Sequence, residues 1–262
     1  MGIVDTAKRQ LKALQDRTIP QRVVFHHVPK CGGTSAGRAL RKRYLLSQAT
    51  VKPEESFRAF EMFTGRTDRE AMLVDVLDLR EQMMLYLMAE DVRCVSLHVR
   101  FSKTAHDHFA DRYKFVTLLR EPVARFISHY NWSYQRDGAF GRIDEPLEAF
   151  LDTPRARQMG ATYGEYFSAQ PVGSDFASDA SVAAAVANLK KMDVVGRLDD
   201  LPGFEAQLRG ALGVRIKLGH ENRKGAARPA HDTTITPELR ARIATLCAPD
   251  ISIWKSVTGA ES

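Results

Sequence analysis

Short apolar runs alternate with longer amphipathic segments along most of this chain. Four runs rich in β-branched or other apolar residues predict buried strands, at 22–28, 92–99, 114–119 and 193–198. Segments with apolar residues at helical spacing lie between these runs, at 34–46, 68–92, 122–135, 178–192 and 202–212. This alternation predicts an α/β fold whose parallel sheet carries helices on both faces.

The rest of the pattern is less regular. A short helix is predicted at 144–152, followed by a loop-rich stretch to about 177. A polar loop is predicted at 219–235, and helical segments close the chain. Residues 1–20 predict an amphipathic helical extension. Because no repeat, low-complexity tract or long linker divides the sequence, we expect residues 1–262 to form a single domain.

Composition narrows the class of protein. The 262 residues can bury a large core, and no apolar run approaches the roughly 20 residues that span a bilayer. The amino terminus lacks the apolar core of a secretory signal, and three widely spaced cysteines predict neither a disulfide framework nor a zinc site. We therefore expect a cytoplasmic protein. A net charge of +6 fits a site for an anionic ligand and does not require nucleic acid.

The segment "VVFHHVPKCGGTS" (23–35) combines a strand, a Gly-Gly turn and the start of a helix. Its glycines allow close backbone approach, its N–H groups can surround an anion, and Lys30 adds a mobile cation. The lysine precedes the glycines, whereas in a Walker A loop it follows them. These features favour a phosphate or sulfate site, although an ordinary strand-to-helix turn capped by Thr34 is the simpler alternative.

A second segment, "KFVTLLREPVARFISHY" (114–130), repeats this architecture. Arg120 stands at the carboxyl end of the strand, Pro122 starts the helix, and Ser128 follows within it. A guanidinium can grip a phosphate through two parallel N–H bonds, and a hydroxyl can complete the site.

Together, "HHVPKCGGTS" and "FVTLLREPVARFISHY" resemble the two donor-binding segments of the sulfotransferase family that includes heparan sulfate 2-O-sulfotransferases. Looser similarity continues at 194–213, 221–226 and 235–254. The resemblance implies a P-loop-NTPase-like parallel sheet flanked by helices, a donor that is 3′-phosphoadenosine 5′-phosphosulfate, and no metal. Cys31 stands where the family usually has threonine, and residues 158–170 match only in outline.

The resemblance also implies roles for particular residues. Contacts with the 5′-phosphosulfate are expected from Lys30, Gly32, Gly33, Thr34 and Ser35. Contacts with the 3′-phosphate are expected from Arg120 and Ser128, and further anion contacts from Arg223 and Lys224 in a loop that closes over the nucleotide. The products are adenosine 3′,5′-bisphosphate and a sulfated hydroxyl acceptor, for which the resemblance suggests a sugar or glycoconjugate.

Sulfuryl transfer to a hydroxyl needs a base for its proton and a cation for the leaving phosphate. His98, near the end of a predicted strand, aligns with the family's catalytic histidine, and Lys30 supplies the cation. His26 and His27 alternate on the first strand, so that one is expected in the core and the other beside the site. His106 and His108 are expected in a solvated loop.

Two other functions remain open from the sequence. A nucleotide-dependent phosphotransferase needs an acidic magnesium ligand, for which Asp199 and Asp200 are candidates, but the position of Lys30 argues against it. A noncatalytic binder of an anionic polymer predicts affinity that falls steeply with salt.

Overall fold

A five-stranded parallel sheet organises the protein. The computed structural model describes residues 19–138, 140–218 and 234–259, and in the amino-terminal segment Thr6, Gln10, Leu11, Ala13 and Arg17. The strands are β1 (Arg22–His26), β2 (Gln48–Val51), β3 (Cys94–Leu97), β4 (Tyr113–Leu119) and β5 (Val194–Arg197). Their order is β2-β3-β1-β4-β5, with every pairing parallel. The predicted P-loop-like α/β fold is thereby confirmed.

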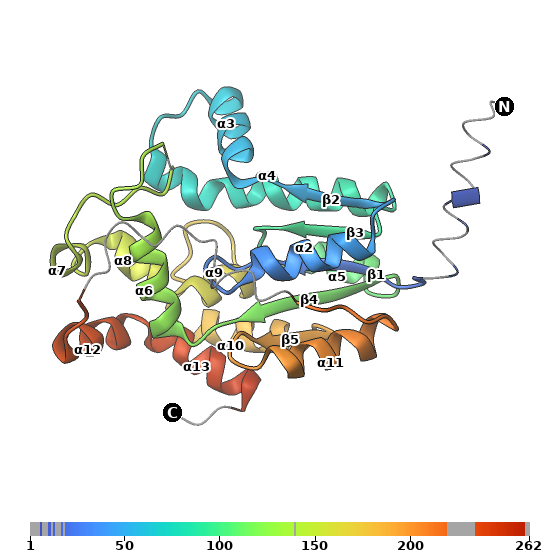
Figure 1. The fold of residues 1–262 in the computed structure, drawn as a ribbon. Helices are drawn as coiled ribbons and strands as arrows, with labels where there is room; N and C mark the ends of the chain where they lie inside the picture. Colours follow the sequence, from blue (N-terminus) through green and yellow to red (C-terminus); the bar gives the residue numbers. More distant parts are fainter. Residues whose placement is uncertain are drawn as a thin grey trace.

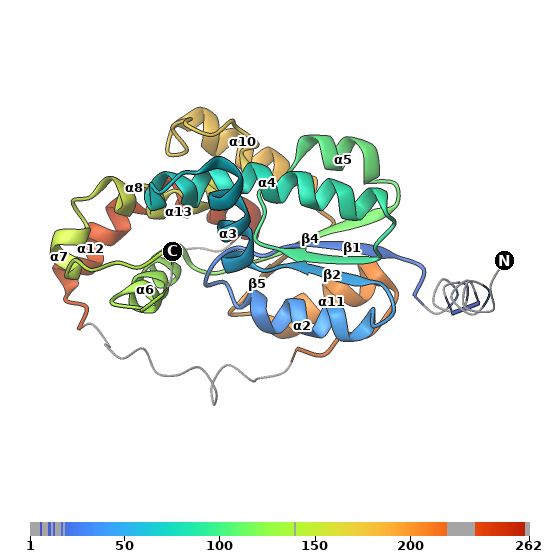
Figure 2. The same cartoon turned by 90° about the horizontal axis from the view of Figure 1, so that it is seen from above.

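Helices cover both faces of this sheet (Figure 2). One face carries α2 (Gly33–Arg43) and α11 (Leu201–Leu212), which bury Leu40 and Phe204 against Phe25 and Val116. The other side holds α4 (Arg69–Ala89), α5 (Lys103–Phe109), α9 (Thr162–Phe167), α10 (Asp179–Leu189) and α13 (Ala248–Thr258). Central strands buried on both faces explain why β1 and β4 read as continuous apolar runs.

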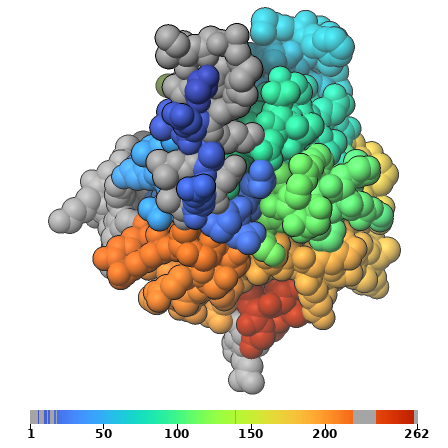
Figure 3. All heavy atoms as spheres, turned by 90° about the vertical axis from the view of Figure 1, so that its right-hand side faces the viewer, coloured from blue at the N-terminus to red at the C-terminus, as the bar shows by residue number. Residues whose placement is uncertain are grey.

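A further group of helices lies beyond the carboxyl ends of the strands (Figure 1). It comprises α6 (Pro122–Ser133), α7 (Leu147–Phe150), α8 (Pro154–Gly160) and α12 (Pro237–Leu246), which share a cluster around Phe126 and Ile243. The opposite end of the sheet faces the viewer in Figure 3, where amino-terminal residues (blue) adjoin those of α11 (orange). Among the named helices, α6, α7, α8 and α12 thus lie at the carboxyl ends of the strands.

Several elements were not predicted from the sequence. Strand β2 is short, lies at the sheet edge and alternates polar with apolar residues, so it lacks the apolar run of a central strand. Helix α3 (Pro53–Thr64) packs on α4, and α8 and α9 replace the expected loop before residue 177. The expectation of a loop around His106 and His108 was wrong, because Ser102 accepts a hydrogen bond from Ala105 N at 2.9 Å and starts α5 there.

Two predicted segments fall wholly or largely outside the described residues. Seven residues of the amino-terminal extension (1–20) are described: Thr6, Gln10, Leu11, Ala13 and Arg17 are helical, and Ile19 and Pro20 are not. The loop at 219–235 is described only from residue 234 onward, so Arg223 and Lys224 lie outside the described residues. None of the helices that the structure describes is long and apolar enough to cross a membrane.

Candidate functional site

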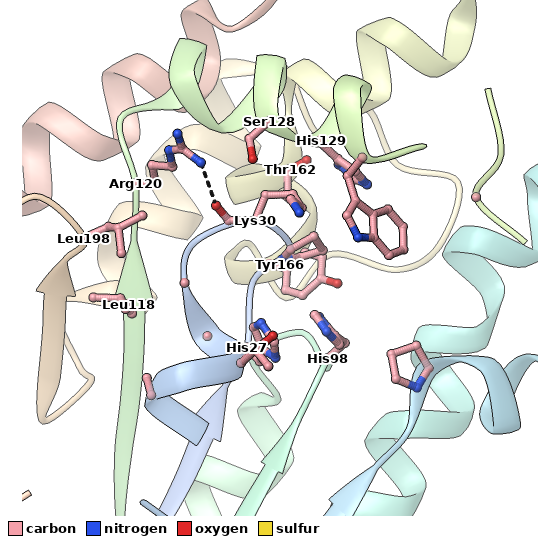
Figure 4. Close-up of a pocket in the computed structure, with 18 of the residues that line it drawn as sticks. His27, Lys30, His98, Leu118, Arg120, Ser128, His129, Thr162, Tyr166 and Leu198 are labelled. Carbon is pink, nitrogen blue, oxygen red and sulfur yellow. Dashed lines mark hydrogen bonds between the residues drawn. The ribbon is translucent and has the colours of Figure 1, made fainter. Parts of the chain in front are cut away.

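A cavity of about 1230 Å³ lies where the β1–α2 loop, the end of β3 and the start of α6 meet. The carboxyl ends of parallel strands converge there, which is where ligands bind in open α/β sheets. Eight sequence-predicted site residues line this cavity: Lys30, Gly32, Gly33, Thr34, Ser35, His98, Arg120 and Ser128. In Figure 4, Lys30 lies between Arg120 and Ser128 on one side and His27 and His98 on the other.

The β1–α2 loop presents backbone donors to the cavity. Helix α2 begins at Gly33 with no side-chain cap, so the N–H groups of its first turn have no intrahelical partner. The loop geometry requires both glycines. Gly32 has a φ of 76°, and a Cβ on Gly33 would lie 1.9 Å from Cδ2 of His27. The result is an open helix N-terminus that favours an anion.

Lys30 projects from this loop with a left-handed backbone, at a φ of 64°. Its Nζ lies 5.2 Å from the ring centroid of Trp132, and the guanidinium carbon of Arg136 lies 3.7 Å from the same ring. Burial, then the charges of Arg120 and Arg136, lower the pKa of Lys30 to about 8. The ammonium is therefore still mostly protonated at neutral pH, but in surroundings where a bound anion would stabilise it.

The β4–α6 segment forms the second basic part of the cavity. Its helix N-terminus is closed, because the Glu121 carboxylate accepts hydrogen bonds from Val123 N at 2.9 Å and Ala124 N at 2.7 Å. An anion here must therefore bind to side chains. Those of Arg120 and Ser128 both line the cavity, and Arg120 Nη1 also donates to the carbonyl of Lys30 at 3.4 Å.

Two histidines stack beside the loop. The rings of His27 and His98 lie 3.8 Å apart between centroids, with an interplanar angle of 28°. Burial, reinforced by His27 and by the charge of Arg80, holds the pKa of His98 well below 6.5. His98 is thus neutral at neutral pH, and its Nδ1 is buried without a hydrogen-bond partner among the described residues. His26 is buried in the core, so the alternation predicted for His26 and His27 is observed.

The remaining wall combines rings with charged groups. Phe57, Trp132 and Tyr166 line it together with Arg155 and Glu165. The Glu165 carboxylate accepts a hydrogen bond from Gln158 Nε2 at 3.2 Å. Burial raises the pKa of Glu165 to about 7, against the opposing effects of Gln158 and nearby arginines. Burial therefore disfavours the ionised form of the Glu165 carboxyl group.

Replacing Glu165 with glutamine should stabilise the protein more near pH 8 than near pH 5. The folded-state pKa of about 7 exceeds the ordinary carboxyl value, so ionisation costs stability as pH rises through this range. The amide of glutamine does not ionise, and its oxygen can still accept the hydrogen bond from Gln158 Nε2. Melting temperatures of both proteins at the two pH values test this. The exposed Glu148→Gln change serves as the control, and an equal or smaller gain near pH 8 would contradict the expectation.

Sequence reasoning did not identify Glu165 or Tyr163 as part of the site. Both lie in α9, in a stretch that matched the family only in outline. Tyr166 lines the cavity, whereas Tyr163 is buried beneath it. The signal was the stretch "TYGEYF" itself, but only tertiary packing separates these two roles. In the described part of the chain, no cluster of three histidine, cysteine or acidic residues could hold a metal ion.

Comparisons with known proteins agree with this geometry. Residues 18–137 match the model of the Sulfotransferase family, a span that includes the β1–α2 loop, His98, Arg120 and Ser128. A search of the curated proteins finds no match. Members of the family transfer sulfuryl groups to hydroxyl-bearing acceptors, which is the coarse activity that the match supports. The part of the chain that carries both anion-binding segments, residues 18–137, is thus similar to the sulfotransferase family.

Proposed function

We propose that this protein transfers a sulfuryl group from 3′-phosphoadenosine 5′-phosphosulfate to a hydroxyl of a sugar or glycoconjugate. The observation that carries the proposal is the presence of two different anion sites in one cavity. One is the uncapped start of α2 with Lys30, and the other is the side-chain pair Arg120 and Ser128. A donor with phosphate groups at both the 5′ and the 3′ position matches this pair.

The residues present fit such a donor. Backbone N–H groups of Gly33, Thr34 and Ser35 are the partnerless donors of the first helical turn, and no side chain of the loop competes for them. Among the described residues no carboxylate forms an ion pair with Lys30 or Arg120. These two cations are therefore available to phosphate oxygens. Contacts from Arg223 and Lys224 remain predictions.

In the proposed reaction, His98 accepts the proton of the acceptor hydroxyl as its oxygen bonds to sulfur. The bond between sulfur and the bridging phosphate oxygen breaks at the same time, and Lys30 places its ammonium beside the oxygen on which negative charge develops. The proton leaves on the imidazolium of His98 and the electron pair leaves with the bisphosphate. Neither residue forms a covalent bond with the donor or the acceptor.

The acceptor assignment rests on the cavity wall and on the resemblance of the sequence. Phe57, Trp132 and Tyr166 offer aromatic surfaces, and Arg155 and Glu165 add polar groups. Sugars bind to such mixtures because their C–H faces pack on rings while their hydroxyls need hydrogen-bond partners. A sugar hydroxyl near His98 is the acceptor that these features favour.

The phosphotransferase alternative loses support at its proposed magnesium ligands. Both carboxylate oxygens of Asp199 accept hydrogen bonds from Arg197, at 3.0 and 2.6 Å. Asp200 Oδ1 accepts a hydrogen bond from Gly203 N at 2.9 Å and so caps α11. Both side chains are thus engaged in local structure, and the lysine order also differs from a Walker A loop.

Adenosine 3′,5′-bisphosphate should stabilise the protein more than ATP, ADP or AMP do. A ligand at 100 times its dissociation constant adds about 2.7 kcal/mol to the free energy of unfolding, provided that it binds only the folded state. The 3′-phosphate is the group that Arg120 and Ser128 are proposed to bind, so nucleotides without it should bind more weakly. Thermal unfolding with each nucleotide, with magnesium present and absent, measures the difference.

Equal shifts for all four nucleotides, or no shift at all, would contradict the donor assignment. Magnesium-dependent turnover of ATP would instead support the phosphotransferase reading. Affinity for a sulfated polymer that falls steeply with salt, with no preference for the bisphosphate, would indicate a noncatalytic binder.

A further inference from the structure

The hydroxyl of Tyr163 lies between the two segments proposed to bind phosphate groups. It accepts a hydrogen bond from the backbone N–H of Arg120 at 3.0 Å and donates one to the carbonyl of the same residue. The same oxygen lies 3.6 Å from Sγ of Cys31, in the β1–α2 loop. One buried hydroxyl therefore contacts both segments, which are about ninety residues apart in the sequence.

The contacts around this hydroxyl form a closed ring. Burial raises the pKa of Cys31 to about 11, so the thiol keeps its proton and can donate to the Tyr163 oxygen. Cys31 follows Lys30 in the chain, and the carbonyl of Lys30 accepts a hydrogen bond from Arg120 Nη1 at 3.4 Å. A shift of either segment thus changes contacts with the other, both directly and through Tyr163.

The backbone of Tyr163 is hydrogen-bonded to helix α13. Its backbone N–H donates to Asp250 Oδ1 at 2.8 Å, and Arg125 Nη2 lies 3.4 Å from Asp250 Oδ2. All three side chains are buried. Tyr163 is therefore anchored through its backbone as well as through its hydroxyl.

We propose that the Tyr163 hydroxyl is a positioning group that couples the two segments, so that the 5′- and 3′-phosphates of one nucleotide bind cooperatively. The proposal rests on the proposed function, because it takes the β1–α2 loop as the 5′ site and Arg120 as part of the 3′ site. Tyr163 touches neither phosphate. It acts by holding Arg120 and the loop in the arrangement that a doubly phosphorylated ligand needs.

Four probes measure this coupling by calorimetry: adenosine, adenosine 5′-monophosphate, adenosine 3′-monophosphate and adenosine 3′,5′-bisphosphate. The coupling factor is a ratio of two gains in binding constant. The first is the gain from adding one phosphate to a nucleotide that already carries the other, and the second is the gain from adding the same phosphate to adenosine. We expect a factor of about ten in the wild-type protein, the scale of one buried hydrogen bond, and a factor close to one in Tyr163→Phe. A purely structural role would weaken all four probes alike and leave this factor unchanged.

Tyr113→Phe is the matched control. Its hydroxyl, also on a buried ring, donates to the carbonyl of Val92 at 2.8 Å, at the other end of β4 from Arg120. This variant should lose stability but keep the wild-type coupling factor.

The outcomes separate the two proposals. If the wild-type protein binds the bisphosphate but shows a coupling factor of one, the role of Tyr163 is refuted and the donor assignment stands. An unchanged factor in Tyr163→Phe refutes it equally. Failure of the wild-type protein to bind the bisphosphate refutes both. Should Tyr163→Phe not fold, the wild-type factor still decides whether the two sites are coupled.

Discussion

Replacing Lys30 with alanine is expected to lower the rate of sulfuryl transfer by about two to three orders of magnitude, the usual effect of removing one group that stabilises developing charge. The ammonium is partly buried, and in such surroundings its charge interacts more strongly with the leaving phosphate than in water. Release of adenosine 3′,5′-bisphosphate, with an acceptor that the wild-type protein uses, measures the loss. The fold should persist, because alanine replaces one side chain at the cavity edge.

The pH dependence offers an independent check on Lys30. Only the protonated amine can stabilise the leaving group, and its pKa of about 8 lies within the accessible range. The kcat/KM for the donor should therefore fall as pH rises through about 8. Lys42→Ala removes the same charge at an exposed position near the end of α2 and should leave transfer unchanged. A Lys30→Ala protein with wild-type transfer would exclude the proposed role.

Replacing His98 with alanine is expected to lower transfer by about two to four orders of magnitude, the range for loss of a general base. The base acts in its neutral form, and burial holds the pKa of His98 well below 6.5. Acidification from neutral pH to about 6.5 should therefore leave the wild-type rate unchanged, with a decline only at lower pH. A pH–rate profile of kcat/KM, which reports the free enzyme, tests this together with the variant.

Two further variants define the result for His98. His108→Ala, at an exposed position on α5, is the control and should retain full transfer. Undiminished transfer by His98→Ala would remove His98 from the role of base. In that case His27→Ala becomes the decisive variant, because its ring is the one stacked on His98.

Local sequence patterns were sufficient for the central part of the fold. β1 and β4 are buried on both faces, so their apolar runs are long and unmistakable, and the glycines mark the turn into α2. The edge strand β2 escaped prediction because it has only four residues, and the exposed polar residues Gln48 and Thr50 leave no apolar run. Helix α3 did carry local signals, Pro53 at its start and Gly65 at its end, which were not used.

The residues of the candidate site also fall into those that local sequence patterns predict and those that they do not. Lys30, Arg120 and Ser128 belong to segments whose order of residue types has a chemical meaning in itself. Tyr163 and Glu165 join them only through the packing of α9 beneath the cavity, so no local spacing relates these residues to the loop. Arg125 illustrates the opposite case. It is a basic residue of the second segment, but it is buried in an ion pair with Asp250.

The missing side chain of Gly33 has a meaning beyond the shape of the loop. The space that a Cβ would occupy is filled by the imidazole of His27, which in turn supports His98. Volume at position 33 and the ring at position 27 thus exclude each other, so the glycine that shapes the loop also affects where the proposed proton acceptor, His98, can lie. Under the proposed function, donor binding and acceptor activation would then share one steric constraint, because a side chain at position 33 would displace the ring on which His98 stacks.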